Sequence, residues 1–309
     1  MRDEIINTVK KTNTTMKKRA FILVIAAGIL WGMSGIFVKN LAPYGFSSLQ
    51  MTALRGGVTL VILLGYAAVF RRSAFRVSLR ELGIFALTGL ALFGTGSCYF
   101  MSMQATSIST AVVLMYMAPV YVTVYSCLFF SEKMSKPKAT AILCVLVGCV
   151  LVSGITDGAK MNAYGIFMGF LSGISYGAYN ILTKISMRRG SSALSATIYS
   201  TVFMLLLALC VSNPQGIVEA VARGGGAALL WILGIGVVTF VLPYLFYTLS
   251  LRDLPAGTAS SLSVVEPMSA TLFGIFIYGE KLTLFSGVGI ALIIFAVILL
   301  GMTETKKEA

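Results

Sequence analysis

The two halves of the chain carry the same spaced pattern of glycine, aromatic and lysine residues, and this duplication constrains the fold most. Residues 26–40 read AAGILWGMSGIFVKN, and residues 171–185 read LSGISYGAYNILTKI. At an offset of 145 residues the matching positions are Gly28 with Gly173, Trp31 with Tyr176, Gly32 with Gly177, and Lys39 with Lys184. Because both segments are strongly apolar, the pattern predicts two related helical units inside a membrane.

A second match connects later parts of the two halves. At an offset of 148 residues the corresponding positions are Thr110 with Thr258, Ala111 with Ala259, Pro119 with Pro267, Glu132 with Glu280, and Lys133 with Lys281. The first half of the chain is therefore a divergent copy of the second half.

The composition indicates a membrane protein. Of 309 residues, 57% are hydrophobic and only 11% are charged, whereas a soluble domain has about 25% charged residues. The apolar runs are continuous and do not alternate, so they predict helices and argue against a β-barrel. The net charge of +13 comes from basic residues between the runs, and we therefore expect no nucleic-acid partner.

Ten apolar runs are long enough to cross about 30 Å of hydrocarbon. They lie near 21–38, 48–70, 81–102, 109–130, 138–155, 163–183, 193–212, 228–250, 257–278 and 283–302. The first run follows basic residues, as in a signal peptide, but it has no clear cleavage site and is expected to be retained. The predicted organisation is a tail at 1–20, five helices in 21–156, five more in 163–302, and a tail at 303–309.

The distribution of lysine and arginine predicts the orientation. With the N-terminus in the cytoplasm, cytoplasmic segments carry 19 basic residues and external segments carry 4, which satisfies the positive-inside rule. The protein is then expected in the plasma membrane, with both termini on its cytoplasmic side. An odd number of helices in each repeat inverts the second repeat, so the predicted fold is an all-α membrane protein of two inverted five-helix repeats around a central cavity.

The sequence contains no signal for a metal, a cofactor or a catalytic residue. It has no histidine, and its five cysteines lie inside apolar runs without metal-ligand spacing. The phosphate-binding pattern G-x-x-x-x-G-K-[ST] is absent, so no direct use of ATP is expected.

These features resemble the EamA domain of the drug/metabolite transporter superfamily. The resemblance rests on the duplicated first helix, on the segments APVYVTVYSCLFFSEKMS and EPMSATLFGIFIYGEKLT, and on their closing Glu-Lys pairs, and it covers residues 20–302. It implies ten helices, a pseudo-twofold axis in the membrane plane, and a cavity lined by helices one, three, four, six, eight and nine. Small multidrug-resistance proteins of this superfamily use a glutamate in the first helix, and this chain has none there.

The candidate substrate-binding residues lie on the helices expected to line the cavity. An aromatic wall with a few polar groups suits a small organic ligand, although any single tyrosine could instead belong to an interfacial belt. The predicted set is Trp31, Tyr99, Tyr116, Tyr176, Asn180, Tyr247, Ser263 and Glu266. Glu266 could contact a substrate amine, exchange a proton, or form a structural hydrogen bond to a serine, a tyrosine or Arg55.

A second group of residues is expected to govern packing and hinge motion. Its members are Gly28, Gly32, Gly173 and Gly177, which allow close helix approach, and Pro119 and Pro267, which break backbone hydrogen bonds. The glycine faces could also slide, and the prolines could be hinges or static kinks. Arg55 is expected to form a structural pair or to snorkel, and the Glu132–Lys133 and Glu280–Lys281 pairs to cap helices or close gates.

The predicted function is secondary transport of a small metabolite by alternating access. The favoured substrate is an amino acid or a related compound, and the favoured direction is export. Expected partners are the small-molecule substrate and the lipid bilayer, with protons left open, and the expected state is a monomer or homodimer. The alternatives are a membrane sensor or scaffold, drug or organic-cation efflux by the same fold, and a lipid-modifying enzyme.

Overall fold

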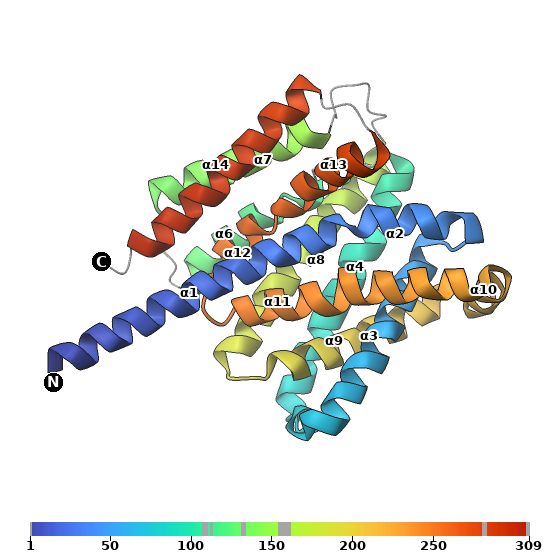
Figure 1. Cartoon of the computed structure of the whole chain (residues 1–309), viewed down its shortest axis with the longest axis horizontal. Coiled ribbons are helices and arrows are strands. Elements are labelled where there is room, and N and C mark those ends of the chain that lie inside the picture. Colours follow the sequence, from blue (N-terminus) through green and yellow to red (C-terminus); the bar gives the residue numbers. More distant parts are fainter. Residues whose placement is uncertain are drawn as a thin grey trace.

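The computed structural model describes residues 2–106, 111, 114–130, 134–153, 162–279 and 283–306. Within these ranges all regular structure is helical (Figure 1). The first half contains α1 (Arg2–Gly32), α2 (Ser34–Leu41), η1 (Ala42–Tyr44), α3 (Ser48–Phe70), η2 (Arg72–Phe75), α4 (Leu79–Ala105), α6 (Ala118–Phe129) and α7 (Lys136–Ser153). The second half contains α8 (Ala163–Arg188), α9 (Ala193–Val211), α10 (Pro214–Gly236), η3 (Val237–Val241), α11 (Leu242–Ser250), α12 (Ala256–Leu262), α13 (Val265–Tyr278) and α14 (Leu284–Lys306).

Six helical segments in the described ranges are long and apolar enough to cross a membrane, and two further apolar helices are shorter. The predicted run at 48–70 coincides with α3, because Ser47 and Gln50 form a capping box that fixes the start of this helix. The all-helical class is confirmed. The ten spans and their inverted arrangement stay predictions.

The predicted run at 228–250 begins later than the helix does. α10 starts at Pro214, where the Asn213 side chain accepts a hydrogen bond from the Gly216 N–H. Gly225 then interrupts this helix with a φ of 55° and a ψ of −144°, which a residue with a Cβ rarely adopts. The apolar part of α10 therefore begins after Gly225, close to the predicted start of the run.

The helices form pairs that recur between the two halves. α4 packs against α8 and α11 packs against α1, while α6 contacts α8 and α13 contacts α1. α3 packs against α9 and α7 packs against α14, and Figure 1 shows α7 and α14 side by side. The N-terminal end of α1 and the C-terminal end of α14 lie at the same end of the bundle (Figure 1).

Three helical segments are interrupted near their middle. Met33 separates α1 from α2, a turn at Tyr116 and Met117 precedes α6, and Ser263 and Val264 separate α12 from α13. Pro119 and Pro267 follow the last two turns and remove the N–H groups that a regular helix would need there. The break at Met33 has no proline beside it and was not predicted.

Another irregularity is the π-helical segment η3. The Leu242 N–H donates to the carbonyl of Val237, five residues earlier, and Pro243 follows immediately. Because proline supplies no N–H, the wider π turn is one way to pass the residue without ending the helix. The segment sets the direction in which the side chains of α11 emerge.

Glycines bring the unbroken part of α1 close to α13. A Cβ added at Gly32 would lie 2.7 Å from the Ser269 Cβ and 2.8 Å from the Glu266 carbonyl oxygen. In the other half, a Cβ added at Gly173 would lie 2.7 Å from the carbonyl oxygen of Leu114. These two glycines, one on each of the matching helices α1 and α8, thus pack against backbone beside the helix breaks, where even a methyl group would not fit.

We expect Gly32→Ala to lower the thermal stability of the purified protein, because its methyl group overlaps the α13 backbone. Overpacking of this kind costs about 1–3 kcal/mol. Gly35→Ala is the matched control, since a Cβ at Gly35 would meet nothing within 4 Å. Thermal unfolding in detergent measures both, and equal midpoints for the two variants would contradict the close approach of α1 and α13.

Candidate functional site

The breaks in the fourth and ninth predicted spans are joined by one hydrogen bond. Glu266 lies in the first turn of α13, and the Tyr116 hydroxyl at the turn before α6 donates to its Oε2 at 2.6 Å. Tyr116 is buried and Glu266 is partly exposed. A carboxylate is thereby held between two interrupted helices, at a depth where charged groups are costly and usually have a function.

Arg55 on α3 supplies a positive charge near this carboxylate. It interacts electrostatically with Glu266 and with Tyr244, and its guanidinium lies 5.7 Å from the ring centroid of Phe240. Its Nη2 donates to the Thr52 hydroxyl at 3.5 Å, whereas its buried Nε has no hydrogen-bond partner within the described ranges. Arg55 thus compensates the charge of Glu266 from a distance.

A second polar network lies between α8, α11 and the break after α12. The Tyr176 hydroxyl donates to the Ser263 hydroxyl at 3.0 Å, and Ser263 donates to the Ser260 carbonyl at 2.7 Å. The Asn180 amide donates to the Tyr176 carbonyl at 2.7 Å and accepts a hydrogen bond from the Tyr247 hydroxyl. All these side chains are buried, so in this conformation their polar groups bind one another.

Aromatic rings form a wall beside the network. Trp31 on α1 lies 5.2 Å from Tyr244 and 5.5 Å from Tyr247, measured between ring centroids. Tyr179 on α8 lies 5.6 Å from Tyr244, 6.2 Å from Tyr247 and 6.3 Å from Tyr176. These distances are those of interacting aromatic pairs, so α1, α8 and α11 meet through their rings.

Seven of the eight predicted binding residues take part in these hydrogen bonds and ring contacts. Tyr99 on α4 is the exception: it interacts with Glu266 electrostatically, and its nearest described ring is that of Phe100 at 5.6 Å. Tyr179 and Tyr244 belong to the wall and were not in the predicted set. Their sequence positions carry the signal, because Tyr179 adjoins Asn180 and Tyr244 lies one helical turn before Tyr247.

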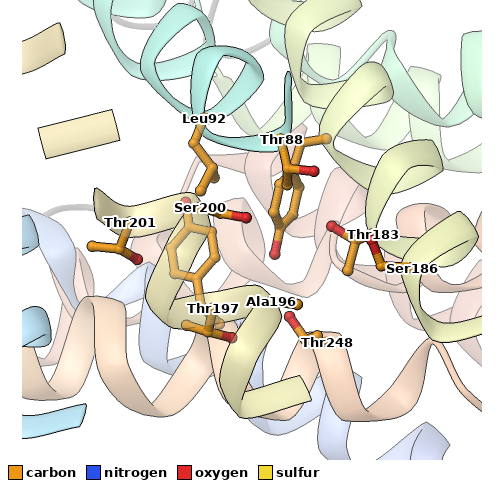
Figure 2. A pocket seen from close by; sticks show the side chains of 11 residues that line it. Thr88, Leu92, Thr183, Ser186, Ala196, Thr197, Ser200, Thr201 and Thr248 are labelled. Atoms are coloured by element: carbon orange, nitrogen blue, oxygen red, sulfur yellow. The ribbon is translucent and has the colours of Figure 1, made fainter. Parts of the chain in front are cut away.

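A cavity lies beside the predicted residues and not among them. It has a volume of about 10 Å³ and lies between α4, α8, α9 and α11 (Figure 2). Tyr179 and Tyr244 form part of its wall, and the remaining lining is rich in hydroxyl groups, from Thr88, Thr183, Ser186, Thr197, Ser200, Thr201 and Thr248. None of the eight predicted binding residues lines it, so the two tyrosines separate this cavity from the central network.

Lys184 forms a contact that the match between the two halves of the sequence did not predict. Its Nζ donates to the carbonyl oxygens of Leu251 at 2.7 Å and Leu254 at 2.6 Å, and the side chain is only 6% exposed. Because α11 ends at Ser250, the ammonium group satisfies the carbonyl at the C-cap of this helix, where positive charge is favourable. It also satisfies the carbonyl of Leu254 in the turn before α12. Its counterpart Lys39 lies 3.7 Å from the Tyr278 ring centroid, so these described contacts of the two lysines differ.

The structure does not test the predicted roles of the two Glu-Lys pairs. The pairs Glu132–Lys133 and Glu280–Lys281 lie outside the described residues. In the part of the chain that the structure covers, no three histidine, cysteine or acidic side chains come together as metal ligands.

We expect Lys184→Met to destabilise the protein, because the carbonyls of Leu251 and Leu254, between α11 and α12, lose this donor. An unsatisfied buried acceptor costs about 1–3 kcal/mol. Arg189→Met removes the same charge from an exposed position that follows α8 and serves as the control. Chemical unfolding followed by circular dichroism compares the two, and a Lys184→Met protein as stable as the control would refute this stabilising role of Lys184.

The chain is similar to known transporters over most of its length. An uncharacterised transporter of Archaeoglobus fulgidus is 29% identical over 89% of this chain and 94% of its own length. The transporter YwfM of Bacillus subtilis is 24% identical over 93% of this chain and 95% of its own, also without an assigned substrate in its name. The threonine/homoserine exporter RhtA of Salmonella typhimurium is 27% identical over 85% of this chain and 83% of its own.

The fold also has a match among solved structures. One crystal structure superposes with a TM-score of 0.79 and 16% sequence identity, over 94% of this chain and 99% of the other. Together with the apolar helices, the transporter relatives identify an integral membrane protein. Residues 18–154 and 163–302 each match the EamA-like transporter family, and the protein therefore belongs to that family.

Proposed function

We propose that the protein is a secondary transporter that exports an amino acid or a closely related metabolite by alternating access. The observation that carries this proposal is the Tyr116–Glu266 hydrogen bond, because it places a carboxylate between two interrupted helices. Broken helices beside a binding site are typical of secondary transporters, where the two halves rearrange around the substrate. A carboxylate at that position suits the ammonium group of an amino acid.

The proposed architecture is ten membrane-spanning helices in two inverted repeats, 21–156 and 163–302. Its support comes from the family matches in both halves and from the recurring helix pairs. The two chain ends lie at one end of the bundle (Figure 1), as cytoplasmic termini in the plasma membrane require. Most of the basic residues fall in the segments that this orientation makes cytoplasmic.

The side chains around Glu266 suggest how an amino acid would be held. The carboxylate binds the substrate ammonium in exchange for Tyr116, and Asn180 and Ser263 supply hydrogen bonds once Tyr247 and Tyr176 move. Trp31 and its neighbouring rings cover the apolar part of the substrate. The name of the relative RhtA, a threonine/homoserine exporter, supports threonine as the first compound to test.

Glu266 is also the group that we propose to exchange protons. In a part of the protein where charge is costly, a carboxyl can release its proton to one side of the membrane and bind the substrate from the other. Competition between proton and ammonium for one carboxylate would couple the proton gradient to export.

We expect Glu266→Gln to abolish proton-driven threonine flux in proteoliposomes, because the amide cannot titrate. Threonine–threonine exchange should continue but need a higher threonine concentration, because the amide oxygen still accepts from the substrate ammonium without the negative charge. Glu219→Gln, at an exposed position on α10, is the control and should leave both activities unchanged. Full pH-gradient-driven flux in Glu266→Gln would overturn the coupling. Absence of flux for every amino acid with the wild-type protein would overturn the transport proposal.

A further inference from the structure

We propose that the hydroxyl-lined cavity between α4, α8, α9 and α11 is a polar antechamber on the cytoplasmic side of the substrate route. Tyr179 and Tyr244 are its inner gate, and its ligand is a zwitterionic amino acid with its hydration water. The inference rests on the proposed transport function and adds to it a second site and two gate residues.

The position of the cavity supports an entry role. It lies near the C-terminal ends of α8 and α11 and the N-terminal end of α9, and Thr183, Thr197 and Thr248 come from these parts. The exposed Arg188 and Arg189 follow directly at the end of α8. In the proposed orientation this end of the bundle is cytoplasmic, so an exported solute would meet the cavity before the central network.

The chemistry of the cavity lining suits the ammonium group of the solute. Thr88, Ser186 and Thr197 donate their hydroxyl protons to the carbonyls of Ile84, Leu182 and Ala193 on their own helices. A hydroxyl whose proton is engaged in this way offers only acceptor lone pairs. Three members of the lining therefore present acceptors to a ligand.

Other hydroxyls of the lining are available as donors. The hydroxyls of Ser200 and Thr201 are buried, at 3% and 0% residue exposure, and have no hydrogen-bond partner within the described ranges. Buried polar groups are normally satisfied by protein or by water. Thr183 and Thr248 also line the cavity, and both interact with Tyr179. Free donors beside oriented acceptors can bind both ends of a zwitterion without a charged side chain.

The volume of about 10 Å³ limits what the cavity admits in this conformation. It holds about one water molecule, so the chamber is collapsed and must widen to admit an amino acid. The inner side is closed by Tyr244, whose ring contacts Tyr179 edge-on at 5.6 Å and Trp31 at 5.2 Å. Tyr244 comes just after Pro243 and the π-helical segment η3, a type of turn that is often found at functional sites.

Cysteine labelling tests the chamber. A Ser200→Cys variant in membrane vesicles is exposed to a membrane-impermeant methanethiosulfonate from either face, and modification of residue 200 is read by mass spectrometry. We expect labelling from the cytoplasmic face at least tenfold faster than from the outer face. Thr59→Cys, also fully buried and without a described hydroxyl partner but outside the lining, should remain unlabelled. An unreactive thiol in the Ser200→Cys variant, or equal rates from both faces, would overturn the antechamber.

The gate is tested with a reporter in the central network. Ser263→Cys should be labelled slowly from the cytoplasmic face, and at least tenfold faster when combined with Tyr244→Ala. Tyr179→Leu provides a second gate variant if Tyr244→Ala does not fold. An unchanged labelling rate in the folded gate variants would exclude these tyrosines as the barrier.

Ligand protection tests the proposed chemistry and separates this inference from the transport function. Threonine should slow the labelling of Ser200→Cys more than its decarboxylated amine or 3-hydroxybutyrate, which each carry one of the two charges. Equal protection by all three would overturn the zwitterion site. If amino acids are transported but the Ser200→Cys thiol is unreactive, the antechamber alone fails. If this thiol is labelled as expected but no amino acid is transported, the proposed function fails.

Discussion

The fold depends on how hydrogen bonds are supplied to backbone groups and to the Glu266 carboxyl within the membrane-spanning part of the protein, where water is scarce. Every interrupted helix leaves polar groups that lipid cannot bind, so breaks are tolerated only where protein or a wet cavity meets them. Here the breaks before α6 and after α12 face each other, and Tyr116 donates to Glu266 across them. This bond holds together two segments from different halves of the chain. Around it, α1, α8 and α11 meet through aromatic rings.

The sequence predicted the parts of the fold that depend on local physics. The run at 48–70 matches α3 because apolar length and a Ser47 capping box define the same helix. The turns before Pro119 and Pro267 follow from the missing N–H of proline. The break at Met33 could not be predicted in this way, since it has no proline and the matching stretch of α8 is continuous. The two halves of the chain therefore differ here in how the matching helices pack against the rest of the protein.

The candidate site was predictable as a group and not in detail. Aromatic and polar residues on the expected lining helices do come together, with Tyr99 less closely than the rest. Tyr179 and Tyr244 were missed because their role depends on how α8 and α11 are rotated, which a π-helical segment partly sets. Lys184 was matched to Lys39 by the repeat, but Lys184 donates to carbonyls that follow α11 whereas Lys39 lies over the Tyr278 ring. Similar sequences thus acquired different contacts.

The most direct test of this account is a double-mutant cycle on Tyr116→Phe and Glu266→Met, measured by unfolding with and without saturating threonine. Without ligand we predict a coupling energy of about 1.5–3 kcal/mol, as for a hydrogen bond to a charged group. With threonine bound, the coupling should fall toward zero, because the substrate ammonium replaces the tyrosine hydroxyl. Additive effects without ligand would contradict the bond between the two helix breaks. A coupling unchanged by threonine would contradict Glu266 as its binding group.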